Sequence, residues 1–373
     1  MASIVASRWR WLSWKASSPD DCPMVPMWFA VVPSFYAEIE RLRDPRLRSR
    51  AVLVGGDPRK KGKVQSVSFE AETAGVRVGM EVRRALELCP QARAVRTDMA
   101  HYREISGSLR ACFRRDAQAI EPLGLESAFI QPSSRKGSDP NRLLEKVRDT
   151  LGLPLRIGVA EIKFLARLAG ENLGREGVFR IRPGTESDFL RPLPVSRLPG
   201  VGPRTVSTLL DIGVRSVGDL LGVDDSEMES RLGNHGLRIL ELARGEDDSV
   251  VQGRQTRQSL SREITFEPPE SDLGVMDEQI ERLSREIATR LDREGWIGHR
   301  VSLRLSFEGG GTSTRSRTLG RPVDGARDLA ALAQGFLALT QAGARPVRRL
   351  GVAVAQLAPS AERDRQLDLF GDS

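Results

Sequence analysis

The stretch that decides the fold is Trp28 to Glu40, WFAVVPSFYAEIE, where an apolar strand runs directly into an amphipathic helix. Trp28 to Val32 is an unbroken apolar run of strand length, and the proline that follows cannot continue it. Many nucleotide enzymes place a metal-binding aspartate at the carboxyl end of a central strand. Here that corner carries Val31, Val32 and Pro33, and none of these side chains can bind a metal ion.

The helix that follows has its own start signal. Ser34 can cap its first turn. The apolar residues Phe35, Ile39 and Leu42 recur at i, i+4 and i+7 on one face. Further strand and helix patterns alternate through residue 190, so the sequence predicts a mixed α/β fold for its first half.

The composition indicates a folded protein with a polyanionic partner. The chain has 373 residues, enough for two to four domains, and 39% of them are apolar. Lys and Arg number 57 against 50 Asp and Glu, and the net charge of +7 favours nucleic acid as the partner. Cys22, Cys89 and Cys112 have neither metal-site nor disulfide spacing and indicate a cytoplasmic protein. No apolar run is long enough for a membrane span, so no membrane partner is expected.

The opening stretch resembles the first strand and helix of the Y-family, or DinB/UmuC-type, DNA polymerases, which read roughly hVDxDxFFAxVE. Aligning the FYA segment at residues 35–37 puts Val31 and Pro33 at the positions of the family's two aspartates. Tyr36 matches the residue that screens the sugar of the incoming nucleotide in the family. The resemblance therefore implies a polymerase-like palm that lacks two metal ligands.

The second half of the family's metal site, SxDEAYLD, resembles GLESAFIQ at residues 124–131. Glu126 replaces the aspartate, and Ser127 replaces the glutamate. Two-metal phosphoryl transfer needs two cations about 4 Å apart, held by several converging carboxylates. A lone Glu126 is a poor cage for two ions, so neither an intact catalytic site nor a metal cofactor is expected.

The resemblance also assigns a triphosphate site. Phe69 and Glu72 match the tyrosine and the arginine that hold the triphosphate in the family. A carboxylate at that place repels phosphate, so nucleotide binding is expected to be weakened. Lys163, in a segment similar to the family's N/VKxLAKxAS helix, matches the triphosphate lysine. The alternative for Lys163 is an ordinary solvated lysine.

The resemblance spans residues 28–357 and implies the family's domain order. The expected fold class is α+β (α/β) and multidomain, with a ferredoxin-like palm, small fingers, a helix-hairpin-helix thumb and a ββ-α little finger. The expected segments are a leader at 1–27, palm and fingers at 28–190, thumb at 191–246, linker at 247–258, little finger at 259–358 and tail at 359–373. The tryptophan-rich leader is either disordered, with a true start near Met24 or Met27, or an aromatic partner-binding segment.

The thumb carries a phosphate-binding motif. In LPGVGPRT, Gly200 and Gly202 expose backbone N–H groups at a helix N-terminus, beside Arg204. Together with the second half-motif IGVRSVGDL, this pattern is typical of a helix-hairpin-helix that grips DNA without reading its sequence. The alternative is a glycine-rich interhelical turn without function.

The little finger is expected to hold the DNA backbone. Residues 299–307 alternate strictly between polar and apolar, as in a half-buried strand. Basic residues gather on this strand and the next, at Arg300, Arg304, Arg315 and Arg317. Basic side chains opposite a core are expected to bind phosphates of damaged or primer–template DNA, although a charge run can also be only a solvated face.

The tail contains QLDLF at residues 366–370. Large apolar residues on a charged tail have no core to join, so a partner is expected to bury them. QLDLF has the form that bacterial sliding-clamp ligands use, in which the glutamine enters a polar site and the second leucine and the phenylalanine fill an apolar cleft. The expected clamp-binding residues are Gln366, Leu367, Leu369 and Phe370.

Three functional hypotheses follow. The preferred one is a non-catalytic DNA-binding scaffold of translesion synthesis and DNA repair, most similar to the catalytically inactive ImuB-type members of the family. That similarity implies SOS mutagenesis, with an error-prone C-family DNA polymerase and an accessory protein as further partners. The alternative is an active error-prone polymerase that uses Mg²⁺ at a site rebuilt around Glu126. The third is a general DNA-binding protein.

Overall fold

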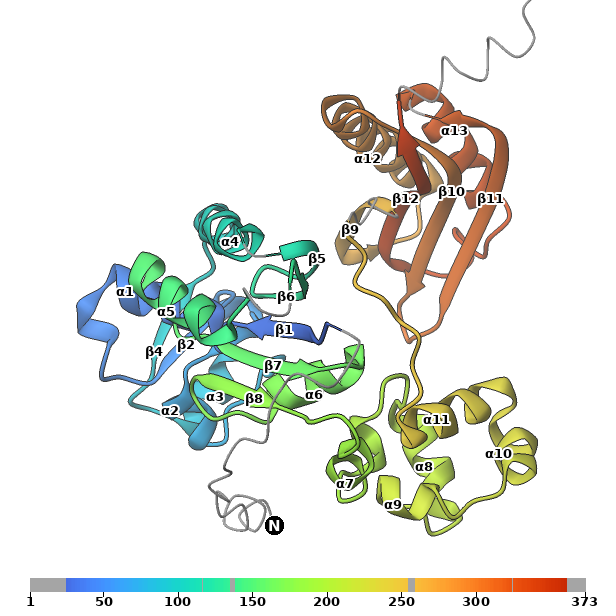
Figure 1. Cartoon of the computed structure of the whole chain (residues 1–373). Coiled ribbons are helices and arrows are strands. Elements are labelled where there is room, and N and C mark those ends of the chain that lie inside the picture. Colours follow the sequence, from blue (N-terminus) through green and yellow to red (C-terminus); the bar gives the residue numbers. More distant parts are fainter. Residues whose placement is uncertain (1–24, 116, 135–137, 254–258, 324, 361–373) are drawn as a thin grey trace, which may run out of the picture. The chain divides into compact units, whose positions relative to one another are not determined.

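The computed structural model describes residues 25–115, 117–134, 138–253, 259–323 and 325–360 (Figure 1). Most of the expected leader and the QLDLF motif lie outside these residues. The chain forms two compact units, Met1–Arg254 and Gln255–Ser373.

The central strand of the first unit is β1 (Met27–Val31), the apolar run that the sequence predicts. The other strands of its sheet are β5 (Ala117–Leu123), β6 (Ser127–Pro132), β7 (Arg156–Ala160) and β8 (Gly177–Arg180). The order is β5-β6-β1-β7-β8, and all neighbours are antiparallel except β7 and β8 (Figure 1). Apart from β8, this is the order of a ferredoxin-like βαββαβ unit, so the expected palm is confirmed.

Helices cover both faces of the palm sheet. On one face the apolar sides of α1 (Phe35–Arg43), α4 (Met99–Arg114) and α5 (Pro140–Leu151) enclose a core with β1. On the other face lies α6 (Lys163–Glu171). This helix approaches β7 closely because Gly158 has no side chain, and a Cβ there would collide with the carbonyl oxygen of Ala166.

The corner between β1 and α1 differs from the prediction in one respect. Ser34 occupies the N-cap position, but its backbone is left-handed, with φ 53°, and its side chain makes no cap hydrogen bond. A capping side chain reaches the first turn from an extended backbone, and a left-handed residue does not present it there. The predicted cap is therefore wrong, although the helix begins at Phe35 as expected.

The fingers form a separate three-stranded sheet between α1 and α4. Its strands are β2 (Val52–Gly55), β3 (Val64–Val67) and β4 (Arg93–Arg96), in the order β3-β2-β4. Its helices are α2 (Phe69–Thr73) and α3 (Val82–Leu88), with 3-10 turns η1 (Pro45–Leu47) and η2 (Pro58–Lys60). The fingers enclose a small apolar core of their own.

The thumb is entirely helical. Its elements are α7 (Glu186–Leu190), η3 (Val195–Arg197), α8 (Pro203–Asp211), α9 (Val217–Leu220), α10 (Asp225–Leu232) and α11 (Asn234–Arg244). The element before the PGVG turn is only the 3-10 turn η3, where the motif predicts a helix. The thumb shares one apolar cluster with the α6 face of the palm, so the two predicted domains have a common core.

The second unit is the expected little finger. Its elements are β9 (Ser259–Glu270), α12 (Leu273–Glu294), β10 (Trp296–Phe307), β11 (Thr312–Val323), α13 (Ala326–Leu337) and β12 (Val347–Pro359). The sheet order is β11-β10-β12-β9, with both helices packed on one face (Figure 1). Among the described residues, no helix is both long and apolar enough to cross a membrane.

Candidate functional site

A row of side chains crosses the palm sheet at the carboxyl end of β1. Val31 pairs with Ser127 of β6 on one side and with Arg156 of β7 on the other. Directly paired residues of antiparallel strands point to the same face, so these three side chains project together on the face that carries α6. The structure thus brings two of the predicted metal-site positions side by side.

The turn between β5 and β6 holds Glu126 and Ser127 by local hydrogen bonds. The Leu125 N–H donates to Glu126 Oε2 at 3.0 Å, and a Cβ on Gly124 would lie 3.0 Å from the same oxygen. The Ser127 hydroxyl donates to the Leu123 carbonyl oxygen at 2.5 Å. The carboxylate of Glu126 is therefore folded back over its own turn, and the hydroxyl of Ser127 is used within it.

These residues do not fit a two-Mg²⁺ site. Val31 and Pro33 offer no oxygen ligand, and Glu126 is the one carboxylate at the corner that the alignment retains. No three His, Cys, Asp or Glu side chains come together as metal ligands in the described part of the chain. Two magnesium ions at reacting phosphates require several converging carboxylates. We therefore derive no reaction step through metal ions at this corner.

Tyr36 is held by a stacked ring. Its ring lies 4.4 Å from the ring of Tyr102 at an interplanar angle of 11°, and the Tyr102 hydroxyl donates to Glu40 Oε1 at 2.7 Å. Burial raises the pKa of Tyr36, and the negative charge of Glu126 raises it further, whereas Arg103 opposes this. The charge of Glu126 thus acts on Tyr36, and their joint role in a nucleotide site stays a prediction.

Lys163 has partners within the first unit. Its Nζ lies 2.6 Å from Glu121 Oε2, donates to the Val250 carbonyl oxygen at 3.1 Å and lies 5.0 Å from the centroid of the Phe129 ring. The side chain is only 13% exposed. The N–H of Gln252 donates to the same Glu121 oxygen at 2.9 Å. The solvated-lysine alternative is therefore wrong, because Lys163 joins the palm to the segment that leaves the thumb.

The two triphosphate positions of the fingers lie on α2 and are exposed. Phe69 is 58% exposed, and Glu72, three residues later in the same helix, is also exposed. Glu72 exerts the charge interaction that acts on Arg156. The sequence analysis missed Arg156, although one signal was available: it is the charged residue in the otherwise apolar strand LRIGVA.

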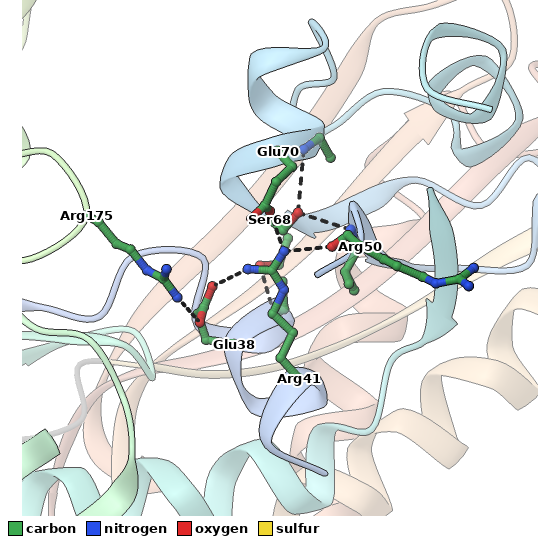
Figure 2. A network of polar contacts seen from close by, with 10 residues as sticks. Glu38, Arg41, Arg50, Ser68, Glu70 and Arg175 are labelled. Carbon is green, nitrogen blue, oxygen red and sulfur yellow. Dashed lines mark hydrogen bonds and ion pairs between the residues drawn. The ribbon is translucent and has the colours of Figure 1, made fainter. Parts of the chain in front are cut away.

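A buried polar network connects helix α1 of the palm to helix α2 of the fingers. Figure 2 shows the Arg41 guanidinium between Glu38 and Glu70, with Arg175 on the far side of Glu38. Arg41 also donates to the carbonyl oxygen of Arg50 at 2.7 Å and is only 4% exposed. This network positions α2, which carries the exposed Phe69 and Glu72.

The thumb motif has the geometry that the sequence predicts at its turn. Gly200 has φ +83°, a left-handed value that favours glycine. Gly202 is the N-cap of α8, and a Cβ there would meet nothing within 4 Å, so an approaching group has open access to the backbone. Arg204 is exposed in the first turn of α8. These residues lie together at one helix N-terminus, as expected for phosphate binding.

The four little-finger arginines do not share a face. Arg300 and Arg304 of β10 pair with Thr318 and Thr314 and lie on the face without helices. Arg315 and Arg317 of β11 pair with Leu303 and Val301, which are buried under the helices. The expectation that all four arginines lie opposite the core is therefore wrong for Arg315 and Arg317. β11 is an edge strand, and these two core-side positions are solvent-exposed and can carry charge.

The open face of the little finger combines these two arginines with small and hydroxyl side chains. Arg300 donates to the Ser316 hydroxyl oxygen at 3.0 Å. Arg315 on the other face donates instead to the carbonyl oxygen of Leu339, just after α13, at 3.3 Å. The open face is therefore the part of the sheet that a nucleic acid backbone can approach over several strands.

Comparisons with known proteins agree with this architecture. Residues 31–171 match the impB/mucB/samB family, and residues 257–369 match that family's C-terminal domain. The chain is 36% identical over 346 residues to DNA polymerase IV of Methanoculleus marisnigri, which covers 90% of this chain and 96% of the relative. It is 34% identical over 343 residues to DNA polymerase IV of Halorhodospira halophila, again over 90% of this chain and 96% of the relative.

Solved structures of the same fold are similar over most of the chain. A Y-family DNA polymerase chimera of Dbh and Dpo4 matches with a TM-score of 0.77 at 21% identity, over 90% of this chain and 99% of that one. DinB from Sulfolobus solfataricus matches with a TM-score of 0.65 at 21% identity, over 88% and 98%. The expected fold class is confirmed. On the sequence matches, the chain belongs to the impB/mucB/samB family, the Y-family of translesion DNA polymerases.

Proposed function

We propose that this protein is a non-catalytic, DNA-binding member of its family, which acts in translesion synthesis as a scaffold. The observation that carries the proposal is the row at the end of β1, where valine, serine and arginine stand at Val31, Ser127 and Arg156. Phosphoryl transfer by two metal ions needs converging carboxylates at such a place. A hydrophobic side chain and a cation cannot replace them.

DNA binding in this proposal rests on the thumb and the little finger. The N-terminus of α8 presents backbone N–H groups, and Arg300 and Arg304 lie on the open face of the little-finger sheet. Two of the similar structures are described as an insertion ternary complex and a post-insertion binary complex of Dbh DNA polymerase, which supports DNA as the ligand of this fold. Both contact types bind phosphates and carry no base specificity.

The scaffold role adds a tether to the bacterial sliding clamp through Gln366, Leu367, Leu369 and Phe370. The support is the QLDLF string on a charged tail beyond the last described strand. The further partners in this proposal are an error-prone C-family DNA polymerase and an accessory protein. The proposed process is SOS mutagenesis, and the proposed subgroup is the ImuB type. The proposed location is the cytoplasm, on nucleoid DNA.

A second candidate function is active error-prone DNA synthesis. The observation that favours it is the set of relatives, which carry the name DNA polymerase IV and align over 90% of this chain. Glu126 also influences Tyr36 electrostatically, which is compatible with a shared nucleotide site. This candidate needs Mg²⁺ at a site rebuilt around Glu126, with further carboxylates that the alignment does not identify.

Primer extension separates the two candidates. The purified full-length protein is incubated with primer–template DNA and all four dNTPs, first with Mg²⁺ and then with Mn²⁺. The scaffold proposal expects no added nucleotide from the parent protein or from a Glu126→Ala variant. Extension by the parent that the variant loses would establish the polymerase and overturn the scaffold. Equal extension by both proteins would identify a contaminating polymerase.

A further inference from the structure

Arg156 stands at the palm corner, and no carboxylate of the described residues forms an ion pair with it. It is the first residue of β7 and pairs with Val31 on one side and with Gly177 of β8 on the other. The row across the sheet is therefore Ser127, Val31 and Arg156, with glycine beyond. The side chains of Ser127 and Val31 are short and uncharged, so Arg156 is the one basic residue of this row.

The guanidinium of Arg156 is partly buried, and one of its nitrogens lacks a hydrogen-bond partner among the described residues. Its Nε is buried and makes no hydrogen bond. Among the ion pairs of the described residues, none within 4.0 Å involves Arg156. Burial lowers its pKa, which the charge of Glu72 opposes, but an arginine stays protonated at any physiological pH. A half-buried cation without an ion pair is costly unless a bound anion neutralises it.

Two neighbouring features define the chemistry of that ligand. The negative charge of Glu72 on α2 of the fingers acts on Arg156. Glu72 itself is exposed and is not the hydrogen-bond partner of Nε. The guanidinium at the end of β1 and a carboxylate of the fingers therefore influence each other electrostatically. A guanidinium fork fits the paired oxygens of a phosphate.

We propose that Arg156 binds a phosphate group at the end of β1 without a metal ion. The ligand is a phosphate of a nucleoside triphosphate or of the DNA backbone, and Glu72 limits its affinity by repulsion. In metal-dependent enzymes a bound metal ion supplies the positive charge beside the phosphate. In this proposal the guanidinium of Arg156 supplies it. The inference concerns binding alone, so it does not depend on whether the scaffold proposal is correct.

The test measures equilibrium binding by the full-length protein in EDTA, so that no divalent metal ion contributes. The probes are inorganic tripolyphosphate and a dNTP, followed by calorimetry, and primer–template DNA, followed by fluorescence anisotropy. The Arg156→Gln variant is expected to lose about tenfold in affinity, which is typical of one charge-assisted phosphate contact. A loss for tripolyphosphate and dNTP identifies the nucleotide as the source, and a loss for DNA alone identifies the backbone.

The matched control is Arg148→Gln, which removes an arginine from α5 on the opposite face of the same sheet, where it pairs with Glu176. This variant should bind as the parent does. A second variant, Glu72→Gln, keeps Arg156 and should bind about threefold tighter because the repulsion is gone. The thermal midpoint of unfolding shows whether Arg156→Gln folds. If it does not fold, the affinity of Glu72→Gln tests the proposal instead.

Unchanged affinity of a folded Arg156→Gln variant for all three probes would overturn the proposal. Unchanged or weaker binding by Glu72→Gln would overturn it as well, because Arg156 would then serve only to offset that carboxylate. Primer extension reports on catalysis with metal ions, whereas this experiment is done without them, so the two proposals fail separately.

Discussion

At Val31 the palm carries an isopropyl group where metal-assisted phosphoryl transfer needs an oxygen ligand. Its two sheet neighbours, Ser127 and Arg156, do not restore a ligand set, because the Ser127 hydroxyl donates within its own turn and the guanidinium is a cation. The fold around them is otherwise that of the family. Single side chains at one end of one strand therefore separate the two candidate functions.

The buried guanidinium of Arg41 gives the first prediction. Replacing it by methionine in Arg41→Met leaves Glu38 and Glu70 without their shared partner, and Glu38 is only 8% exposed. Removing one partner of a buried ion pair costs about 3 kcal/mol, so the free energy of unfolding should fall by about that amount. Chemical denaturation with urea measures it.

The control for this prediction lies on the same helix. Arg43 pairs with Asp98 at 3.1 Å, and both side chains are exposed to solvent. Exposed ion pairs contribute about 0–1 kcal/mol, so Arg43→Met should be nearly neutral. Equal losses for the two variants would mean that burial of the Arg41 network does not determine its contribution.

At the scale of elements, the register of one hairpin decides which arginines can meet DNA together. In β10 and β11, Arg304 pairs with Thr314 and Leu303 pairs with Arg315. Because side chains alternate across a strand, a shift of one residue in this pairing would move every β11 arginine to the other face. The hairpin loop therefore determines the basic surface as much as the arginines do.

The second prediction follows from this division. An Arg300→Gln, Arg304→Gln double variant should bind primer–template DNA more weakly, and the plot of log affinity against log salt concentration should be shallower by about 1.8. The Arg315→Gln, Arg317→Gln pair removes the same charge from the face with helices and should change that slope much less. Fluorescence anisotropy over a range of KCl concentrations provides the slopes. A larger effect from the second pair would show that the helix face binds the DNA.

At the scale of the whole molecule, the chain consists of two units joined near residue 254, followed by the charged tail. Each unit has its own core, and the first holds the palm, fingers and thumb. The residues proposed to bind phosphate are distributed over both units. Under the scaffold proposal the protein holds DNA without catalysing a reaction on it, and the proposed clamp tether determines where it acts.

The tail gives the third prediction. Phe370→Ala should weaken binding to a bacterial sliding clamp at least about tenfold, because a buried aromatic anchor commonly dominates such an interface. Asp368→Ala changes the one residue of the motif that is not an expected clamp contact and should bind nearly as the parent does. Surface plasmon resonance with immobilised clamp measures both. Parent-like binding by Phe370→Ala would remove the tether from the proposed function.

The sequence by itself determined the elements and their order. Apolar periodicity located β1, α1 and the alternating strand β10 to within a few residues, because these patterns reflect a local geometry of 2 or 3.6 residues per repeat. The sequence also showed the missing metal ligands, since a side chain without oxygen cannot bind magnesium in any fold. The predicted Ser34 cap failed because a local pattern does not fix the backbone angles of a corner.

Only the tertiary structure decided which residues meet. Lys163 contacts Glu121 and the Val250 carbonyl oxygen, which are 42 and 87 residues away along the chain. Arg156 could be seen as a charge in an apolar strand, but its place beside Val31 follows from the sheet order β6-β1-β7. The faces of the little-finger arginines follow from a hairpin register. Such contacts depend on how distant segments pair, and a sequence pattern reports only on neighbours along the chain.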